Sequence, residues 1–133
     1  PGKAITFGLL GGKPYLGLSG NPAAAYVGFE MLARPAIRKM RGFAEGTRPV
    51  QQATLTHGVK KRQHRRFFDR ATVLRDPETG ELLVTEAKTQ NSALLGTMQR
   101  ANCLLRVDEG PCDLKVGDVV DIVRVDLPEG AVL

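Results

Sequence analysis

The chain has 133 residues, of which 42% are hydrophobic, 25% charged and 5% aromatic, the balance of an ordinary globular protein. This composition excludes a disordered or fibrous protein, and no apolar run approaches the roughly 18 residues that a membrane-spanning helix needs. We therefore expect no membrane partner. Cys103 and Cys112 are too few for a disulfide-stapled secreted scaffold, so we expect free thiols and a cytoplasmic location.

The formal net charge of +5 is unevenly distributed. Residues 34–75 contain twelve Lys and Arg residues against two acidic ones, Glu45 and Asp69, whereas the rest of the chain carries seven basic and twelve acidic residues. A basic block of this size attracts anions through Coulomb interaction and counterion release. It indicates phosphate groups, nucleic acid or an acidic neighbouring domain as partners, or else a solvated face without a ligand.

The first 45 residues are predicted to form a hairpin followed by a helix. Residues 4–8 and 15–18 read as short strands joined by a turn at 11–14. Asn21 is a preferred N-cap and Pro22 suits the first helical position, so a helix begins there and ends at Gly42, with a kink near Arg34 because Pro35 lacks an N–H. The residues spaced three or four apart along it are predicted to face the core: Tyr26, Phe29, Ala33, Ile37 and Met40.

Near residue 46 the apolar period changes from helical to strand-like, which predicts a second unit. Residues 92–101 lack alternation and indicate a short helical turn or an irregular connection. Five short strands over this stretch suggest a small β-barrel or sandwich. The predicted strands are 50–56, 66–74, 82–87, 103–107 and 119–125.

Two segments are candidate anion sites. Residues 17–22 place a glycine-bracketed loop between a strand and a helix start, where backbone N–H groups and the helix dipole attract anions, although a plain capped turn fits the same residues. The second segment combines aromatic and basic residues, whose guanidinium groups suit oxyanions and whose rings would also permit stacking on single-stranded nucleic acid. It contains Arg62, His64, Arg65, Arg66, Phe67, Phe68 and Arg70.

Two further features bear on chemistry. The segment 89–92 gathers four hydrogen-bonding side chains after a predicted strand, and it could either face a polar ligand or cap a local turn. His57 and His64 have no Cys or carboxylate at ligand spacing, so we expect no metal site in this chain.

These segments, in this order, resemble the C-terminal part of the molybdopterin molybdotransferase family, which includes MoeA and the E domain of gephyrin. Enzymes of that family insert molybdate into adenylylated molybdopterin during synthesis of the molybdenum cofactor. Residues 1–3 and 17–22 resemble two signatures near the end of the family's α/β pterin-binding domain. Residues 65–70, 90–102 and 116–120 resemble its small C-terminal β-barrel.

The resemblance implies an α+β fold in which residues 1–45 are a strand hairpin and helix from the end of the pterin-binding domain and residues 46–133 are an all-β barrel. It implies that Lys3 contacts phosphate or molybdate and that the loop Gly20-Asn21-Pro22 lines the pterin pocket. Arg65, Arg70 and Ser92 would hold the oxyanion from the barrel side. The implied substrate-binding set is Lys3, Ser19, Gly20, Asn21, Pro22, Arg65, Arg70 and Ser92.

The family's Gly-Gly-x-Ser-x-Gly-x-x-Asp segment, which supplies an acidic residue for magnesium, is not in this sequence. Because the chain opens at Pro1 without a leader, we expect a fragment that is inactive alone and prone to self-association. Magnesium would then be held by residues outside the chain, and no catalytic residue is assigned within it. For the full-length protein we expect a homodimer.

Two other function classes fit the residues. One is a stand-alone basic β-barrel that binds RNA or single-stranded DNA through residues 60–70, whereas the family reading expects no nucleic acid. The other is a pure interaction domain, a role that the gephyrin branch of the family suggests.

Overall fold

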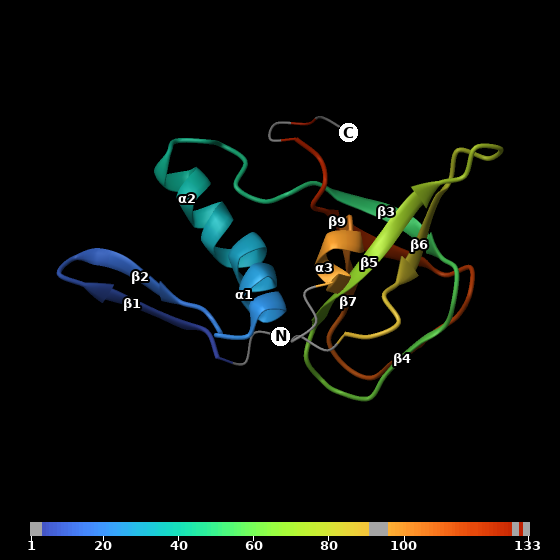
Figure 1. Cartoon of the computed structure of the whole chain (residues 1–133), viewed down its shortest axis with the longest axis horizontal. Helices are drawn as coiled ribbons and strands as arrows, with labels where there is room; N and C mark the ends of the chain where they lie inside the picture. The colour runs from blue at the N-terminus through green and yellow to red at the C-terminus, as the bar shows by residue number, and fades with distance from the viewer. Residues whose placement is uncertain (1–3, 91–95, 129–130, 132–133) are drawn as a thin grey trace. The chain divides into compact units, whose positions relative to one another are not determined.

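The computed structural model describes residues 4–90, 96–128 and 131 (Figure 1). The chain divides into two compact units between Thr47 and Arg48, two residues after the predicted boundary, and each unit is described by itself. Within the described part of the chain, no helix is long and apolar enough to span a membrane.

The first unit begins with the predicted hairpin. β1 (Thr6–Leu10) pairs antiparallel with β2 (Lys13–Gly17), so the strands start and end slightly differently from the predicted 4–8 and 15–18. The two residues between the strands are Gly11 and Gly12, with φ of 56° and 75°. Positive φ at both positions is the geometry of a tight two-residue hairpin turn, and glycine adopts it without steric cost.

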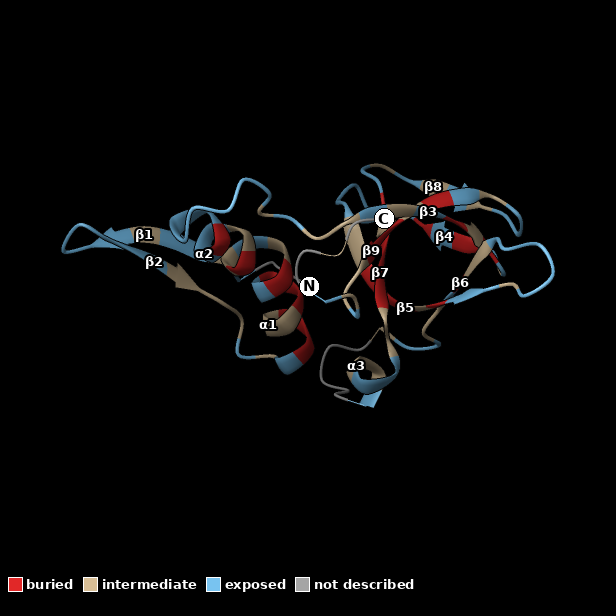
Figure 2. Cartoon of the chain, turned by 90° about the horizontal axis from the view of Figure 1, so that it is seen from above, coloured by how far each residue is buried: buried red, intermediate tan, exposed pale blue. Residues whose placement is uncertain are grey.

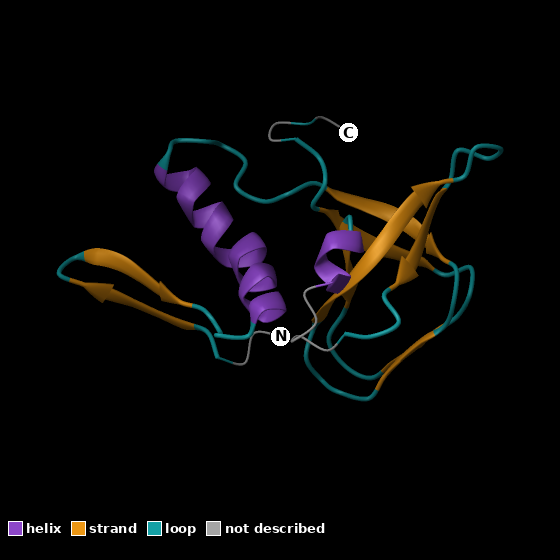
Figure 3. Cartoon of the chain, viewed as in Figure 1, coloured by secondary structure: helices purple, strands orange, loops and turns teal. Residues whose placement is uncertain are grey.

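The predicted helix is present and is interrupted where Pro35 requires it. α1 (Pro22–Gly28) continues into a single π-helical turn, η1 (Phe29–Ala33), which is followed by α2 (Arg34–Met40) (Figure 3). A proline inside a helix lacks the N–H of the regular ladder and its ring crowds the carbonyl four residues earlier. A π turn changes the local hydrogen-bond pattern immediately before Pro35, which explains the break near Arg34.

The predicted core stripe of this helix is wrong in three of its members. Phe29, Ile37 and Met40 are 42%, 46% and 72% exposed in this chain. The apolar residues at three- and four-residue spacing therefore lie away from the buried side of the helix. The buried positions follow a different stripe, made of Ala23, Ala24, Val27, Glu30, Arg34 and Arg38.

The second unit is a closed five-stranded barrel, as predicted (Figure 3). The order around the barrel is β3-β6-β5-β7-β9; β3 and β6 run parallel, and every other neighbouring pair is antiparallel. All five predicted strands are confirmed within two residues. Their bounds are β3 (Val50–Leu55), β5 (Phe67–Arg75), β6 (Leu82–Glu86), β7 (Cys103–Val107) and β9 (Val119–Arg124).

Three short elements accompany the barrel. β4 (Val59–Lys61) and β8 (Cys112–Leu114), which were not predicted, form a separate antiparallel pair. α3 (Gly96–Arg100) lies in the stretch for which a helical turn or an irregular connection was predicted.

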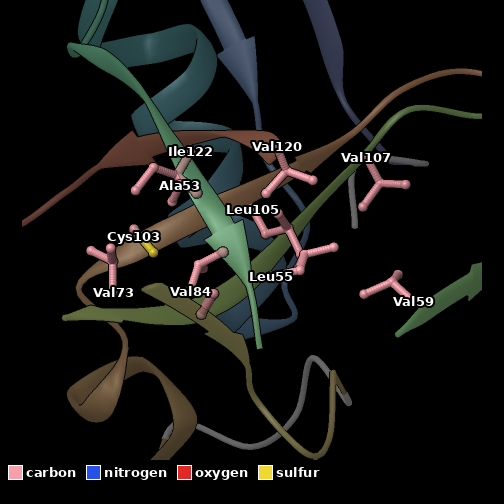
Figure 4. Close-up of a cluster of buried hydrophobic side chains, with 11 residues drawn as sticks. Ala53, Leu55, Val59, Val73, Val84, Cys103, Leu105, Val107, Val120 and Ile122 are labelled. Atoms are coloured by element: carbon pink, nitrogen blue, oxygen red, sulfur yellow. The ribbon is translucent and has the colours of Figure 1, made fainter. Parts of the chain in front are cut away.

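The barrel core consists of the inward-facing residues at alternating positions of all five barrel strands, together with Val59 of β4 (Figure 4). On β5, for example, Ala71 and Val73 are buried and Leu74 is exposed; Figure 2 shows the division into buried and exposed segments over the described residues. Cys103 is a buried apolar member of the core, and burial raises the pKa of its thiol to about 12. The cluster comprises Ala53, Leu55, Val59, Ala71, Val73, Val84, Cys103, Leu105, Val107, Val120 and Ile122.

Candidate anion-binding site

The basic loop at residues 62–66, between β4 and β5, is held through its backbone. Lys61, the last residue of β4, is only 5% exposed, and its Nζ donates hydrogen bonds to the carbonyl oxygens of Arg65 (2.7 Å) and Asp108. The His64 carbonyl oxygen accepts a hydrogen bond from the Gly110 N–H at 3.0 Å. The loop is thereby attached at two points to the turn at 108–110, which follows β7.

The two adjacent arginines of this loop have different surroundings. The Arg66 guanidinium forms ion pairs with Asp108 and Glu109, each at 3.6 Å. Arg65 is exposed, and its guanidinium has no carboxylate partner within the described part of the chain. Its charge is therefore the one in this pair that is available to an external anion.

Arg70 lies in the middle of β5 and is the largest fully buried side chain, with 1% exposure. Burial lowers the pKa of its guanidinium, and the neighbouring charge of Asp69 opposes that effect. Strand alternation places Arg70 on the opposite face of β5 from the core residues Ala71 and Val73. The side chain is thus buried outside the barrel interior.

Asp69 lies on the inward face of β5 and shares a hydrogen bond with Glu86 of β6. Burial and the nearby Glu86 charge raise the pKa of Asp69 to about 7. Two carboxyl groups in one poorly solvated place favour a shared proton over two negative charges. The charge balance beside Arg70 therefore changes near neutral pH.

Side-chain amides complete the backbone hydrogen bonding of β5. Gln90 Oε1 accepts from the Arg70 N–H, and Gln90 Nε2 donates to the Arg70 carbonyl, both at 2.9 Å. Asn102 makes the equivalent pair with Val73, at 2.7 and 2.9 Å. Gln90 thus makes long-range hydrogen bonds to β5, a role that neither the predicted ligand contact nor the predicted local turn cap describes.

Gln90 also lines an open hollow of ≈ 520 Å³ beside the end of β6. The Glu86 N–H donates to His57 Nε2 at 2.7 Å in the wall of this hollow. The hydroxyls of Thr56 and Thr85 lie 2.7 Å apart there. The remaining lining is Ala87 and Lys88, so polar side chains outnumber apolar ones among the residues that line the hollow.

The predicted loop of the first unit, at residues 19–22, is ordered by its own short contacts. The Asn21 N–H donates to Ser19 Oγ at 3.2 Å, and Pro22 occupies the first turn of α1. Asn21 is the N-cap residue of α1, as predicted, and its carbonyl accepts from the Ala25 N–H at 2.8 Å, although its side chain makes no capping hydrogen bond. An added Cβ at Gly20 would meet nothing within 4 Å, so space is open above this glycine.

The structure divides the predicted site residues between the two units. Ser19, Gly20, Asn21 and Pro22 are consecutive in the first, whereas Arg65 and Arg70 belong to the second. Lys3 and Ser92 lie outside the described residues.

Sequence reasoning missed Lys61 and Asn102. Lys61 was counted only as part of the basic block, because nothing in the sequence shows that its ammonium group is buried against carbonyl oxygens. Its alternation with Val59 in a three-residue strand was too short a signal to detect.

Residues 4–90 and 96–128 contain no group of three or more His, Cys, Asp or Glu side chains that could hold a metal ion. The magnesium that the family resemblance implies thus has no such group of donors among these residues.

The comparisons with known proteins agree on one family. The family model for the MoeA C-terminal region (domain IV) matches residues 52–125. The molybdopterin molybdenumtransferase 1 of Mycobacterium tuberculosis is 35% identical over 127 residues, which cover 92% of this chain and 30% of that protein. The molybdopterin molybdenumtransferase of Staphylococcus aureus is 32% identical over 126 residues, which cover 95% and 30%.

Solved structures show the same likeness. A molybdopterin biosynthesis MoeA protein from Pyrococcus horikoshii matches with a TM-score of 0.71 at 25% sequence identity, over 93% of this chain and 29% of that one. The chain thus spans about 30% of the length of the curated relatives that it matches. Because the family model covers more than half of the sequence and reaches across all five barrel strands, the chain belongs to the MoeA-like molybdopterin biosynthesis family.

Proposed function

We propose that this chain is part of a molybdopterin molybdenumtransferase, which inserts molybdate into adenylylated molybdopterin. Family membership and the names of the relatives from M. tuberculosis and S. aureus support this assignment. Since the chain covers 30% of those relatives, the proposed activity belongs to the full-length protein, and the chain alone is expected to be inactive.

In this proposal the barrel supplies positive charge to a tetrahedral oxyanion. The observation that carries it is the exposed Arg65 guanidinium on a loop whose backbone is held by Lys61 and Gly110. A guanidinium fork binds oxyanions through two parallel N–H groups, and a fixed backbone reduces the entropy lost on binding. Arg70 adds a second, buried guanidinium within the same segment.

The remaining predicted residues keep the roles that the family resemblance implies. Lys3 and Ser92 contribute an ammonium group and a hydroxyl to the anion, and residues 19–22 line the pterin pocket. Molybdate and the phosphorylated pterin are both anionic, so catalysis by these residues is positioning together with charge stabilisation. In this proposal magnesium would be held by residues outside this chain.

The test uses the full-length protein and the molybdate concentration that gives half-maximal insertion. Arg65→Ala should raise that concentration about tenfold, a loss of about 1.4 kcal/mol, because the guanidinium is removed without disturbing the barrel. Arg65→Lys keeps the charge but lacks the forked guanidinium. Its half-maximal molybdate concentration should therefore lie between those of the unaltered protein and Arg65→Ala. Arg62→Ala is the matched control, since Arg62 is exposed in the same loop, and equal effects of the two alanine variants would contradict the proposal.

A double variant of the same loop separates the nucleic-acid alternative from the enzyme. Steeply salt-dependent binding of a single-stranded oligonucleotide, lost in Arg65→Ala plus Arg66→Ala while molybdate insertion is unchanged, would favour the stand-alone binding barrel.

We also propose that the full-length protein is a homodimer, and sedimentation equilibrium would decide between dimer and monomer.

A further inference from the structure

β5 is longer than the part of it that either neighbouring strand covers. β7 pairs with Phe67–Ala71 on one side, and β6 pairs with Ala71–Arg75 on the other. Each end of β5 therefore has backbone N–H and C=O groups that face a side without a strand. Such groups are costly to bury unless another polar group pairs with them.

Two amide side chains occupy these two places. Beyond the end of β6, Gln90 pairs with both backbone groups of Arg70, and its Nε2 also donates to the Ala87 carbonyl at 3.3 Å. Immediately before β7, Asn102 pairs with both backbone groups of Val73. A carboxamide carries one acceptor and two donor hydrogens, so it can substitute for the peptide group of an absent strand.

The two amides differ in the residue of β5 whose backbone groups they bind. Val73 belongs to the hydrophobic core, so Asn102 supports packing alone. Arg70 is one of the two barrel arginines to which the proposed function assigns the oxyanion. Fixing its N–H and C=O sets the direction of its Cα–Cβ bond, from which the buried guanidinium extends.

We propose, resting on the proposed function, that Gln90 is a positioning residue for oxyanion binding, acting through the backbone of Arg70. In Gln90→Leu the Arg70 carbonyl keeps its hydrogen bond from the Ala87 N–H at 2.9 Å. The Arg70 N–H, however, loses the acceptor that Gln90 provides. In this variant β5 remains, and the Arg70 side chain loses its fixed orientation.

The experiment compares Gln90→Leu with Asn102→Leu in the full-length protein, using molybdate as the probe in isothermal titration. Each variant removes a side-chain amide that pairs with the backbone of β5, so both should lower the melting temperature by a similar amount. Gln90→Leu should weaken molybdate binding about tenfold, and Asn102→Leu less than about twofold. If Gln90→Leu does not fold, Gln90→Glu replaces it, because its carboxylate still accepts from the Arg70 N–H; the expected loss is then about threefold.

Amide hydrogen exchange shows directly which residue of β5 each variant loosens. The Arg70 amide should exchange faster in Gln90→Leu and the Val73 amide faster in Asn102→Leu, each without the other. A variant that loosened the whole barrel would accelerate both.

Arg70→Lys distinguishes the two ways in which the idea can fail. If the unaltered protein does not bind molybdate, or if Arg70→Lys binds it equally well, the proposed role of Arg70 is overturned and the role of Gln90 with it. If Arg70→Lys weakens binding while Gln90→Leu and Asn102→Leu have the same small effect, only the positioning role is overturned.

Discussion

Asp69 illustrates how one carboxyl group links the stability of the barrel to pH. Its raised pKa means that the folded protein holds a proton that the unfolded chain releases, because the ordinary value for Asp is 3.8 and the folded value is about 7. Between these values the folded state binds more protons than the unfolded state. Stability from this group is therefore present at low pH and is lost as the pH rises toward 7.

We accordingly expect the melting temperature to be higher at pH 5 than at pH 8, by about 5 °C. Asp69→Asn keeps the shape and the hydrogen bond to Glu86 but cannot ionise, so it should flatten this dependence and stabilise the barrel at pH 8. Calorimetry at both pH values provides the measurement. An Asp69→Asn protein with the same pH slope as the unaltered one would show that another group is responsible.

Lys61 tests whether a buried ammonium group stabilises the loop that carries Arg65. Lys61→Met keeps the aliphatic stem and removes the donors, leaving the Arg65 and Asp108 carbonyls without this partner. We expect a loss of about 2 kcal/mol in urea unfolding, whereas Lys60→Met, at the exposed neighbouring position, should change stability by less than about 0.5 kcal/mol. Similar results for both variants would refute a specific role for the buried ammonium.

At the level of elements, the strands of the barrel could be predicted because alternation is a local pattern. β3, β5, β6, β7 and β9 each contain at least five residues, which is enough for the pattern to show. β4 and β8 contain three residues each, too few for a period to emerge. Their pairing depends on contacts between distant parts of the chain.

The helix shows a different limit. Its apolar residues recur at three- and four-residue intervals, but so do Glu30, Arg34 and Arg38, and periodicity alone does not tell which stripe is buried. The candidate site has the same limit. The cationic residues and the resemblance could be recognised from the sequence, whereas the contacts of Lys61, Gln90 and Asn102 are made across the fold.

The turn before β9 offers a test of backbone geometry. Gly117 has φ of 91°, and its N–H donates to the Leu55 carbonyl at 2.9 Å. Gly117→Ala should destabilise the barrel by about 1 to 2 kcal/mol, because a side chain disfavours this left-handed conformation. Val116→Ala, at the exposed preceding residue, should have a much smaller effect in the same urea titration. Equal losses would mean that the turn conformation is not the cause.

At the scale of the whole molecule, the first unit exposes several large apolar side chains. Phe7 and Leu9 are exposed on one face of β1, and Leu10 and Tyr15 are also exposed on the hairpin. We expect the chain to self-associate as its concentration rises, as light scattering would show. Phe7→Ser with Leu9→Ser should reduce this association, whereas Leu74→Ser, at an exposed barrel position, should not; a monodisperse monomer at high concentration would refute the expectation.

The pairing of β3 with β9 has a consequence for how the barrel can be rearranged. Val50, at the start of the first barrel strand, lies opposite Val123, near the end of the last one, and the Arg48 side chain donates to the Leu127 carbonyl at 3.2 Å. The chain therefore enters and leaves the barrel at the same corner. A short linker between these two ends, with a new opening in the exposed turn at 77–80, would produce a circular permutant that retains every strand pair.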